Sequence, residues 1–308
     1  MYLTQSPVLF LVFNRPSTTE QVFEAIRKAK PQKLYIAADG AREGNESDVI
    51  NSQKVKEIVS AVDWDCEVKT LFREKNLGCK YAISSAIDWF FENEPEGIIL
   101  EDDCLPSFEF FKFCDMMLNH YREDNRIRFI AGSNFQKDKK IGDGSYYFSN
   151  LSHVWGWASW RRAWNDYDVE LNKYREQDNL TAFKSIFSNE LLAQDWNDII
   201  QRLHNNQIDT WDYQWAITNM FNHGLSIMPN ANLISNIGFG AAATHTFESN
   251  GFENLTYGKL DEVLVHPTFF LASKEADFST LRKEHNLDYR LKKIARKAKR
   301  DRFKFWKK

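Results

Sequence analysis

Three consecutive acidic residues, Glu101-Asp102-Asp103, are the strongest candidates for chemistry in this chain of 308 residues. Grouped carboxylates suit a hard divalent cation, because Mg²⁺ and Mn²⁺ bind through one or two carboxylates together with phosphate oxygens and water. The alternative is a solvated acidic turn, which is common. The position favours the metal: the triplet follows the apolar segment Ile98-Ile99-Leu100, and like charges at the end of a buried strand repel one another without a cation.

The geometry of a strand limits how the triplet can act. Successive side chains point to opposite faces, so Glu101 and Asp103 should face one way and Asp102 the other, unless the chain turns there. We therefore expect one or two direct ligands to Mn²⁺ or Mg²⁺. Asp103 is the first choice, and the remaining acid is expected to bind ribose or a metal-bound water.

The elements that must position the triplet alternate between strands and helices. Strands are expected at 8–13, 33–38, 66–72, 97–100 and 127–131, and helices at 17–29, 49–62, 77–91, 107–121, 180–204 and 211–222. Ser17-Thr18-Thr19-Glu20 is expected to form a capping box at the start of the first helix. This alternation predicts an α/β fold with a mainly parallel, doubly wound sheet. Ligands of such sheets bind beyond the carboxyl ends of the strands, where Asn14-Arg15, Asp39-Gly40 and the triplet are expected to meet.

Other patterns exclude some classes of protein. The chain has no GxGxxG and no GxxxxGK[ST], which removes the usual sequence support for NAD binding or a P-loop. The glycine-rich N-terminal loop of sugar nucleotidyltransferases is absent too. The longest apolar run, Val8–Phe13, is far shorter than the roughly 20 residues of a membrane span, and no secretory signal opens the chain. With four cysteines and no CxxC pair, we expect a soluble cytoplasmic protein with reduced thiols.

The segment 98–111, in which a proline and paired aromatic residues follow the triplet, resembles the Glu-Asp-Asp segment of the N-acetylglucosaminyltransferases that initiate complex N-glycan branching. Residues 13–16, 38–40 and 76–78 are similar to the larger inverting GT-A glycosyltransferase group, which includes family-2-like enzymes. The resemblance covers roughly residues 6–135, is weaker over 150–250 and does not reach the C-terminal tail.

The resemblance implies a GT-A-type, Rossmann-like catalytic domain over residues 1–270, followed by a basic helical tail at 271–308. Residues 1–105 would bind the nucleotide-sugar, and residues 106–270 would bind the acceptor. The implied reaction is metal-dependent transfer of a hexosyl or N-acetylhexosaminyl group from a UDP-sugar to a glycan or lipid-linked saccharide, with inversion. A retaining GT-A transferase and a carbohydrate-binding protein without catalysis are the alternatives.

The resemblance also implies nucleotide contacts. Asp39 would accept a hydrogen bond from uracil N3–H, a proton that cytosine lacks, although Asp-Gly is also a common turn. Arg15 lies where a phosphate or uracil contact is expected, and Asp102 is expected to join it in binding the nucleotide-sugar. Lys80 could reach a phosphate from the start of its helix. Both cations could instead be solvated at the surface.

Asp212, in the segment Thr210–Trp215, is the candidate general base because it resembles the aromatic-Asp segment that carries the base in the N-acetylglucosaminyltransferases. A first helical turn favours the anion, whereas flanking aromatic residues disfavour it by desolvation. The alternative is an ordinary acid at a helix N-terminus. Asp195 and Asp209 are weaker candidates.

Two later segments complete the expected site. His153–Trp157 resembles a Gly-Trp stretch near the donor sugar, with Trp157 as a contact and Gly156 permitting close backbone approach, although tryptophans of the core would give the same pattern. Residues 238–246 suit a loop that closes over the donor. His245 in that loop is a candidate third metal ligand, although a lone histidine is usually structural.

The tail has a charge pattern of its own. Residues 282–308 contain 13 Lys and Arg against three acidic residues, and Leu287, Leu291, Ile294 and Ala298 share one helical face. Such a basic amphipathic helix is predicted to contact anionic lipid on the inner face of a membrane. A solvated, partly disordered end is the alternative. The rest of the chain is acidic, which argues against nucleic-acid binding.

Overall fold

The computed structural model describes residues 2–137, 139–238, 252 and 255–305, with side chains to 299. Its centre is an eight-stranded sheet with the order β3-β2-β1-β4-β8-β6-β9-β7. The strands are β1 (Val8–Val12), β2 (Lys33–Ala38), β3 (Glu67–Phe72), β4 (Glu96–Glu101), β6 (Ile127–Ala131), β7 (Tyr146–Ser149), β8 (Trp157–Trp160) and β9 (Leu225–Pro229). A small antiparallel sheet pairs β5 (Cys104–Pro106) with β10 (Ile234–Asn236).

The large sheet is mixed and mainly parallel. Strands β3, β2, β1 and β4 pair in parallel, as do β6 and β9. Only β8 and β7 run against their neighbours. Every residue of β1 and β6 is buried, as expected for strands covered on both faces. The predicted α/β class, with a mainly parallel sheet flanked by helices, is confirmed.

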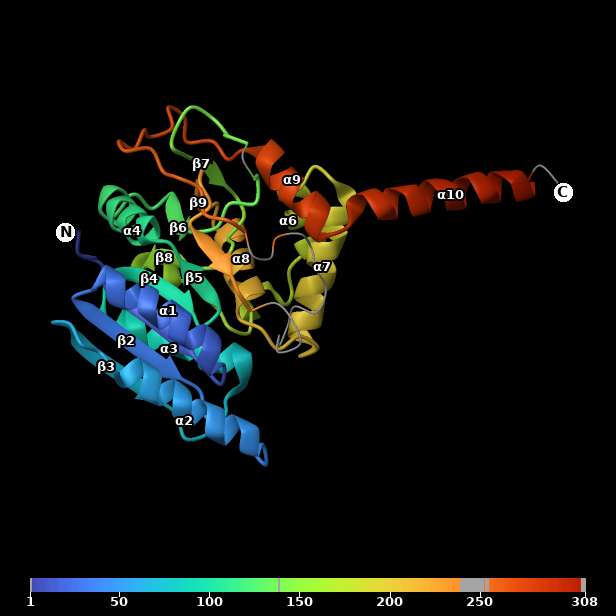
Figure 1. The fold of residues 1–308 in the computed structure, drawn as a ribbon. Coiled ribbons are helices and arrows are strands. Elements are labelled where there is room, and N and C mark those ends of the chain that lie inside the picture. Colours follow the sequence, from blue (N-terminus) through green and yellow to red (C-terminus); the bar gives the residue numbers. More distant parts are fainter. Residues whose placement is uncertain (1, 138, 239–251, 253–254, 306–308) are drawn as a thin grey trace.

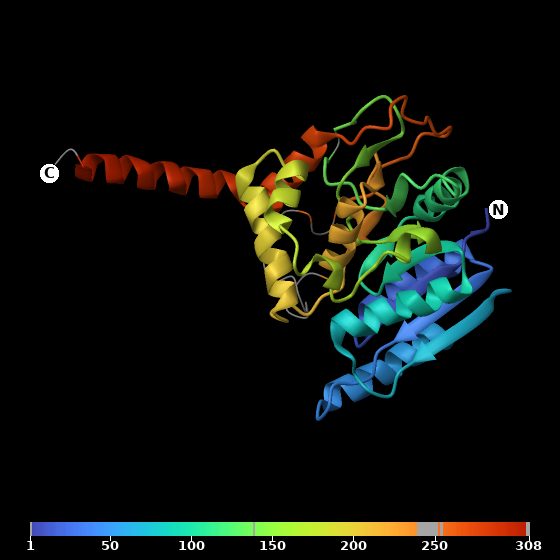
Figure 2. The ribbon, with the colours of Figure 1, turned by 180° about the vertical axis from the view of Figure 1, so that it is seen from behind.

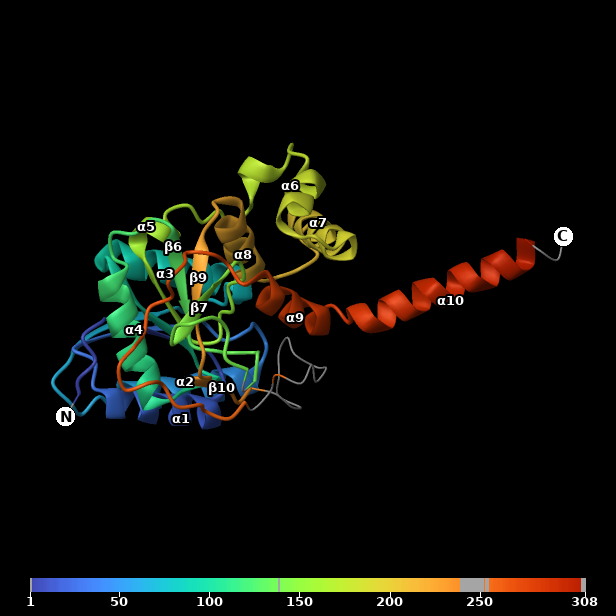
Figure 3. The ribbon, with the colours of Figure 1, turned by 90° about the horizontal axis from the view of Figure 1, so that it is seen from above.

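The helices cover both faces of the sheet. They are α1 (Pro16–Ala29), α2 (Glu46–Ser60), α3 (Gly78–Asn93), α4 (Phe108–His120), α5 (Arg161–Trp164), α6 (Asn179–Ile186), α7 (Glu190–His204), α8 (Asp212–Phe221), α9 (Lys274–Glu284) and α10 (Leu287–Phe305), with a 3₁₀ turn η1 (Asn172–Tyr174). One core cluster joins α1, α2 and α4 to the sheet, and the other joins α3, α5, α6, α7 and α8 to it. Figure 3 shows these two groups on opposite sides of the strands.

The first helix begins one residue earlier than predicted. Pro16 occupies its first turn, and the preceding residue, Arg15, makes no capping bond with its side chain. The predicted capping box is therefore wrong. Proline suits this position because it has no N–H that would need a partner in the first turn.

The single helix predicted at 180–204 is two helices, α6 and α7. Asn189 separates them, and its side chain accepts hydrogen bonds from the backbone N–H groups of Leu191 and Leu192. An N-cap of this kind starts a new helix because it satisfies donors that the first helical turn leaves free.

The expected tail is also two elements. Helix α9 packs on the body, where Ala276 and Leu281 are buried in the core. Helix α10 alone projects away from the body (Figures 1 and 2). The projecting segment therefore begins near Leu287. In the part of the chain that the structure describes, none of the helices has the length and apolar character needed to cross a bilayer.

Candidate functional site

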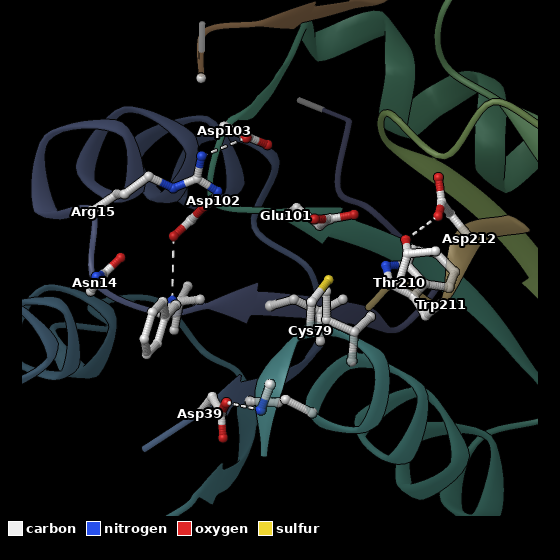
Figure 4. A pocket seen from close by; sticks show the side chains of 18 of the residues that line it. Asn14, Arg15, Asp39, Cys79, Glu101, Asp102, Asp103, Thr210, Trp211 and Asp212 are labelled. Carbon is white, nitrogen blue, oxygen red and sulfur yellow. Dashed lines mark hydrogen bonds and ion pairs between the residues drawn. The ribbon is translucent and has the colours of Figure 1, made fainter. Parts of the chain in front are cut away.

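A cavity of about 460 Å³ lies at the carboxyl ends of β1, β2 and β4 (Figure 4). Its volume is typical of small-ligand sites. The three strands are parallel neighbours in the sheet, so the segments that follow them meet at one edge. Six of the residues singled out in the sequence line it: Arg15, Asp39, Glu101, Asp102, Asp103 and Asp212. The expected convergence of polar strand ends is therefore observed.

The chain turns directly after β4, at Asp102-Asp103. As a result, both side chains reach the same guanidinium and do not point to opposite faces. Arg15 donates from Nη1 to Asp103 Oδ2 at 2.7 Å and from Nη2 to Asp102 Oδ1, and Asp102 also accepts the backbone N–H of Phe13 at 3.3 Å. A planar guanidinium is suited to such paired contacts with carboxylates.

Glu101 lies between this ion pair and Asp212 in Figure 4. Burial, followed by the charge of Asp103, raises the pKa of Glu101 well above its ordinary value. Burial also raises the pKa of Asp102 to about 6, although the charge of Arg15 opposes the rise. Three carboxyl groups against one guanidinium make this corner short of positive charge.

The donor chemistry of this corner fits Mg²⁺ or Mn²⁺, because three oxygen-bearing acids with excess negative charge face a cavity large enough for a diphosphate. Among the described residues, no three His, Cys, Asp or Glu side chains form a complete metal-binding set. A cation held by Glu101 and Asp103 would therefore need further oxygen ligands from a phosphate or water. The candidate ligand His245 and most of the predicted loop 238–246 lie outside the described residues.

The chain approaches the acidic corner again after β10. The backbone N–H of Ile237 donates to the carbonyl oxygen of Asp103 at 2.8 Å. Gly238 follows, and a Cβ atom at Gly238 would lie 2.3 Å from Asp103 Oδ2. A side chain at position 238 would therefore displace the Asp103 side chain.

Asp39 joins β2 to the start of α3. Its carboxylate accepts hydrogen bonds from the backbone N–H groups of Leu77 at 3.0 Å and Gly78 at 3.2 Å, and from Asn76 Nδ2 at 2.9 Å. Burial raises the pKa of Asp39, and these backbone hydrogen bonds oppose the rise. Gly40 allows the close approach, because a Cβ there would lie 2.4 Å from the carbonyl carbon of Lys75. Asp39 thus has a structural role as well as a place in the cavity wall.

Two of the predicted contacts lie away from the cavity wall. The ammonium group of Lys80 pairs with Glu170 at 2.8 Å, and Lys80 is buried outside the lining. Trp157 is fully buried in the core, where its ring stacks on Phe129 and Trp211. The aromatic residues that line the cavity are Trp155 and Trp211, together with Phe13. Trp157 belongs to β8, a central strand whose residues are all buried. It therefore packs in the core and does not line the cavity as the expected contact with the donor sugar.

The glycine between these tryptophans serves the core as well. Gly156 has a positive φ of 59°, and a Cβ there would lie 2.5 Å from Ile234 Cδ1. The close approach that Gly156 permits is therefore to the core side chain of Ile234.

Asp212 opens α8 on the wall opposite the ion pair and accepts a hydrogen bond from the hydroxyl of Thr210. The two weaker candidates are occupied differently. Asp209 also lines the cavity and accepts the backbone N–H of Lys80 at 3.1 Å. Asp195 lies outside this cavity and binds Arg290 at 2.8 Å.

Two further cations line the cavity, Arg42 and Arg73, which were not among the residues predicted from the sequence. Arg42 pairs with Asp48, and Arg73 donates to Ser85 Oγ at 2.8 Å. Arg73 directly follows β3, so the rule that ligands bind beyond strand ends could have found it. Arg42 lies in the loop between β2 and α2 and had no comparable signal.

Comparisons with known proteins give no family. No family model and no curated protein matches the chain. Several solved structures are similar in part. HddC from Yersinia pseudotuberculosis has 11% identity and a TM-score of 0.32, over 53% of this chain and 80% of its own. UDP-glucose pyrophosphorylase complexed with UDP-glucose has 8% identity and a TM-score of 0.38, over 76% of this chain and 94% of its own. Mouse xyloside xylosyltransferase 1 has 10% identity and a TM-score of 0.35, over 69% of this chain and 80% of its own. With such low scores, these similarities assign neither a family nor an activity.

Proposed function

We propose that this protein is a metal-dependent glycosyltransferase that moves a sugar from a UDP-sugar to a glycan or lipid-linked saccharide, with inversion. One observation carries the proposal: Glu101, Asp102 and Asp103 line the same cavity as Asp212, from opposite walls. A leaving diphosphate needs neutralisation on one side of the sugar, and an attacking hydroxyl needs a base on the other. The cavity offers both.

The nucleotide would occupy the side of the cavity formed by β1, β2 and α3. Asp39 would contact the uracil base, and Arg73 would offer positive charge to the phosphates, whereas the guanidinium of Arg42 is already paired with Asp48. Glu101 and Asp103 would hold Mn²⁺ or Mg²⁺. That ion supplies charge neutralisation at the diphosphate as a Lewis acid. Arg15 keeps Asp102 and Asp103 in place through its paired contacts.

Asp212 would act as the general base. The acceptor oxygen forms a bond to the anomeric carbon, and the bond from that carbon to the diphosphate oxygen breaks with its electron pair leaving on the oxygen. The acceptor proton moves to a carboxylate oxygen of Asp212, which the hydroxyl of Thr210 holds from the other side. Such a base contributes roughly 10²–10⁴-fold to a rate.

We also propose that α10 brings the protein to the anionic inner face of a membrane, where lipid-linked acceptors are found. The helix projects from the body (Figure 1), and all its described side chains from Leu291 to Lys299 are exposed. Lys292, Lys293, Arg296 and Lys297 give it positive charge beside the apolar residues Leu291 and Ile294.

The test is a panel of nucleotide-sugars incubated with Mn²⁺, in which release of UDP and slow hydrolysis of the donor are measured. We expect at least one UDP-sugar to be consumed, and consumption to stop when EDTA removes the cation. UDP-sugars that bind without turnover in the presence of acceptors would favour a carbohydrate-binding protein. Products that keep the anomeric configuration would favour a retaining transferase.

A further inference from the structure

A second, larger cavity of about 910 Å³ adjoins the first. It is enclosed by α7, α8, α9 and the segment 151–155. The two cavities share part of their walls: Val154, Trp155, Asp209, Thr210 and Asp212 line both. A molecule in the second cavity can therefore reach the residue proposed as the base without entering the nucleotide cavity.

The lining of the second cavity is acidic. Five carboxyl groups and one guanidinium face it: those of Asp195, Asp198, Asp209, Asp212 and Glu284, and that of Arg202. Among the described residues, Asp195 is the one carboxyl group of the lining that pairs with an Arg or Lys side chain, since Arg290 binds both its oxygens. Within the described part of the chain, the Asp198 carboxylate forms no hydrogen bond or ion pair. The lining carries a net negative charge that disfavours an anionic ligand, although solvent screens the exposed carboxylates of Asp198 and Asp209 and the charge of Arg290 acts on Asp198.

Glu284 and His153 lie next to each other in the lining of the second cavity. Glu284 Oε1 and His153 Nδ1 are 3.9 Å apart, too far for a hydrogen bond. Desolvation raises the pKa of Glu284 to about 7 and lowers the pKa of His153 to about 4. His153 is therefore uncharged at neutral pH and does not offset the acids. His285, whose pKa burial also lowers, adds no stable positive charge.

The same cavity has apolar and aromatic surface. Trp155, Tyr213, Ile199 and Ile208 are half-buried in its wall. The ring of Tyr213 meets that of Trp196 edge-on at 5.8 Å between centroids. A saccharide combines C–H faces that pack on such surfaces with hydroxyl groups that donate to carboxylates.

We infer that the second cavity binds the acceptor, and that this acceptor is a neutral saccharide whose hydroxyls donate to Asp198 and Glu284. The shared wall presents one of its hydroxyls to Asp212, so the inference rests on the proposed function for that step. Saccharides carrying a uronate or phosphate at this position are rejected by the acidic lining.

The test measures binding in the intact protein with UDP and Mn²⁺ present. The probes are neutral trisaccharides of glucose, galactose or N-acetylglucosamine, each with a matched trisaccharide that ends in a uronic acid. We expect a neutral trisaccharide to bind at least 10-fold more tightly than its uronate counterpart. In the double variant Asp198→Asn/Glu284→Gln, we expect neutral binding to weaken and uronate binding to strengthen. This gain cannot arise from misfolding.

Glu190→Gln is the matched control, because Glu190 lies on α7 outside both linings and pairs with Lys184. It should leave every affinity unchanged. Equal or tighter binding of uronates by the unmodified protein, or an absence of binding by all neutral probes, would overturn the inference. UDP binding is read separately: if UDP binds and saccharides do not, only the acceptor site fails. If saccharides bind and UDP does not, the proposed transferase fails and the saccharide site remains.

Discussion

At the scale of single residues, two carboxyl groups of the same cavity have different hydrogen-bond partners. Asp212 and Asp39 both line the first cavity, yet Asp212 accepts a hydrogen bond from the hydroxyl of Thr210 and Asp39 accepts from backbone N–H groups at the start of α3. Replacing them should therefore have different consequences. Substitution of Asp212 should lower turnover, and substitution of Asp39 should lower both the stability of the fold and the affinity for UDP.

Asp212→Asn should lower the turnover number by roughly 10²–10⁴-fold, because an amide cannot accept the acceptor proton. The affinity for UDP should be unchanged, since Asp212 lies across the cavity from Arg15 and Asp39, the residues proposed to contact the nucleotide. Turnover and calorimetric UDP titration check the two expectations. The control is Glu190→Gln, which also changes an acid in a first helical turn. Near-full turnover of Asp212→Asn would contradict the assignment of the base.

Glu284 predicts a dependence of folding on pH. Its pKa is raised from 4.5 to about 7 in the folded protein, so the folded state favours the protonated form. The associated stabilisation is complete below pH 4.5 and is lost as the pH rises through 7. Glu284→Gln should therefore be more stable than the unmodified protein at pH 8 and similar to it near pH 4.5. The difference should be well below the about 3 kcal/mol that 1.4 kcal/mol per pKa unit gives, because the Glu284 residue is partly exposed and solvent screens its charge.

Urea unfolding at pH 4.5, 6 and 8 measures this difference. The carboxyl groups of Asp195 and Asp198 face the same cavity, as do His153, His285 and Arg202, and they remain in the variant. The comparison therefore isolates Glu284. An equal pH slope in the two proteins would show that Glu284 titrates as a solvated acid.

At the scale of elements, the site depends on how β2 is joined to α3. Gly78 begins α3 with a positive φ of 75°, and Leu77 before it offers no side-chain cap. Asp39 supplies the missing acceptor from a distant strand, through the backbone N–H groups of both residues. The junction thus holds one wall of the first cavity and the start of α3 together.

Asp39→Ala should lower the free energy of unfolding by about 1–2 kcal/mol, as loss of an N-cap does, and should also weaken UDP binding. Asp39→Asn retains an acceptor oxygen, so its stability should change less, while UDP binding still weakens because the charge is lost. Asn45→Ala is the control: it removes the N-cap of α2, which lies outside the lining. It should lose stability and retain UDP affinity. Unchanged UDP affinity in both Asp39 variants would restrict Asp39 to its structural role.

At the scale of the whole molecule, α10 stands apart from an acidic body. The helix extends from the same side as α9, beside the second cavity (Figures 1 and 3). A membrane bound along α10 would therefore lie near the proposed acceptor site. This arrangement suits a saccharide held at a lipid surface.

Lys292→Gln/Lys293→Gln should weaken binding to phosphatidylserine vesicles by about 30-fold, since each basic residue near an anionic surface is worth about 1 kcal/mol. Neutral phosphatidylcholine vesicles should bind neither protein well, and UDP affinity should be unchanged. Lys28→Gln/Lys54→Gln is the matched control, because these exposed lysines lie on α1 and α2. Co-sedimentation with vesicles measures the effect. Equal losses in the two double variants would show that net charge acts and not α10.

The sequence by itself determined the alternating strands and helices, and with them the edge at which Arg15, Asp39 and Glu101–Asp103 meet. These features follow from local hydrophobic periodicity and from the rule for parallel sheets, which need no knowledge of distant contacts. The ends of the five predicted strands and of most predicted helices lie within three residues of those observed, whereas β5, β7, β8, β9 and β10 were not predicted. The start of the helix that carries Asp212 was likewise predicted from local sequence, at residue 211 against the observed Asp212.

Only the tertiary structure decided which side chains face a cavity. Trp155 and Trp157 are two residues apart in sequence, yet one lines the site and the other stacks in the core, because β8 is covered by helices from both sides. Lys80 forms an ion pair with Glu170, which is 90 residues away in the sequence. Helices α7, α8 and α9 line a second cavity that no local sequence pattern predicted. Such contacts join segments far apart in the chain, so their geometry is set by packing and not by spacing.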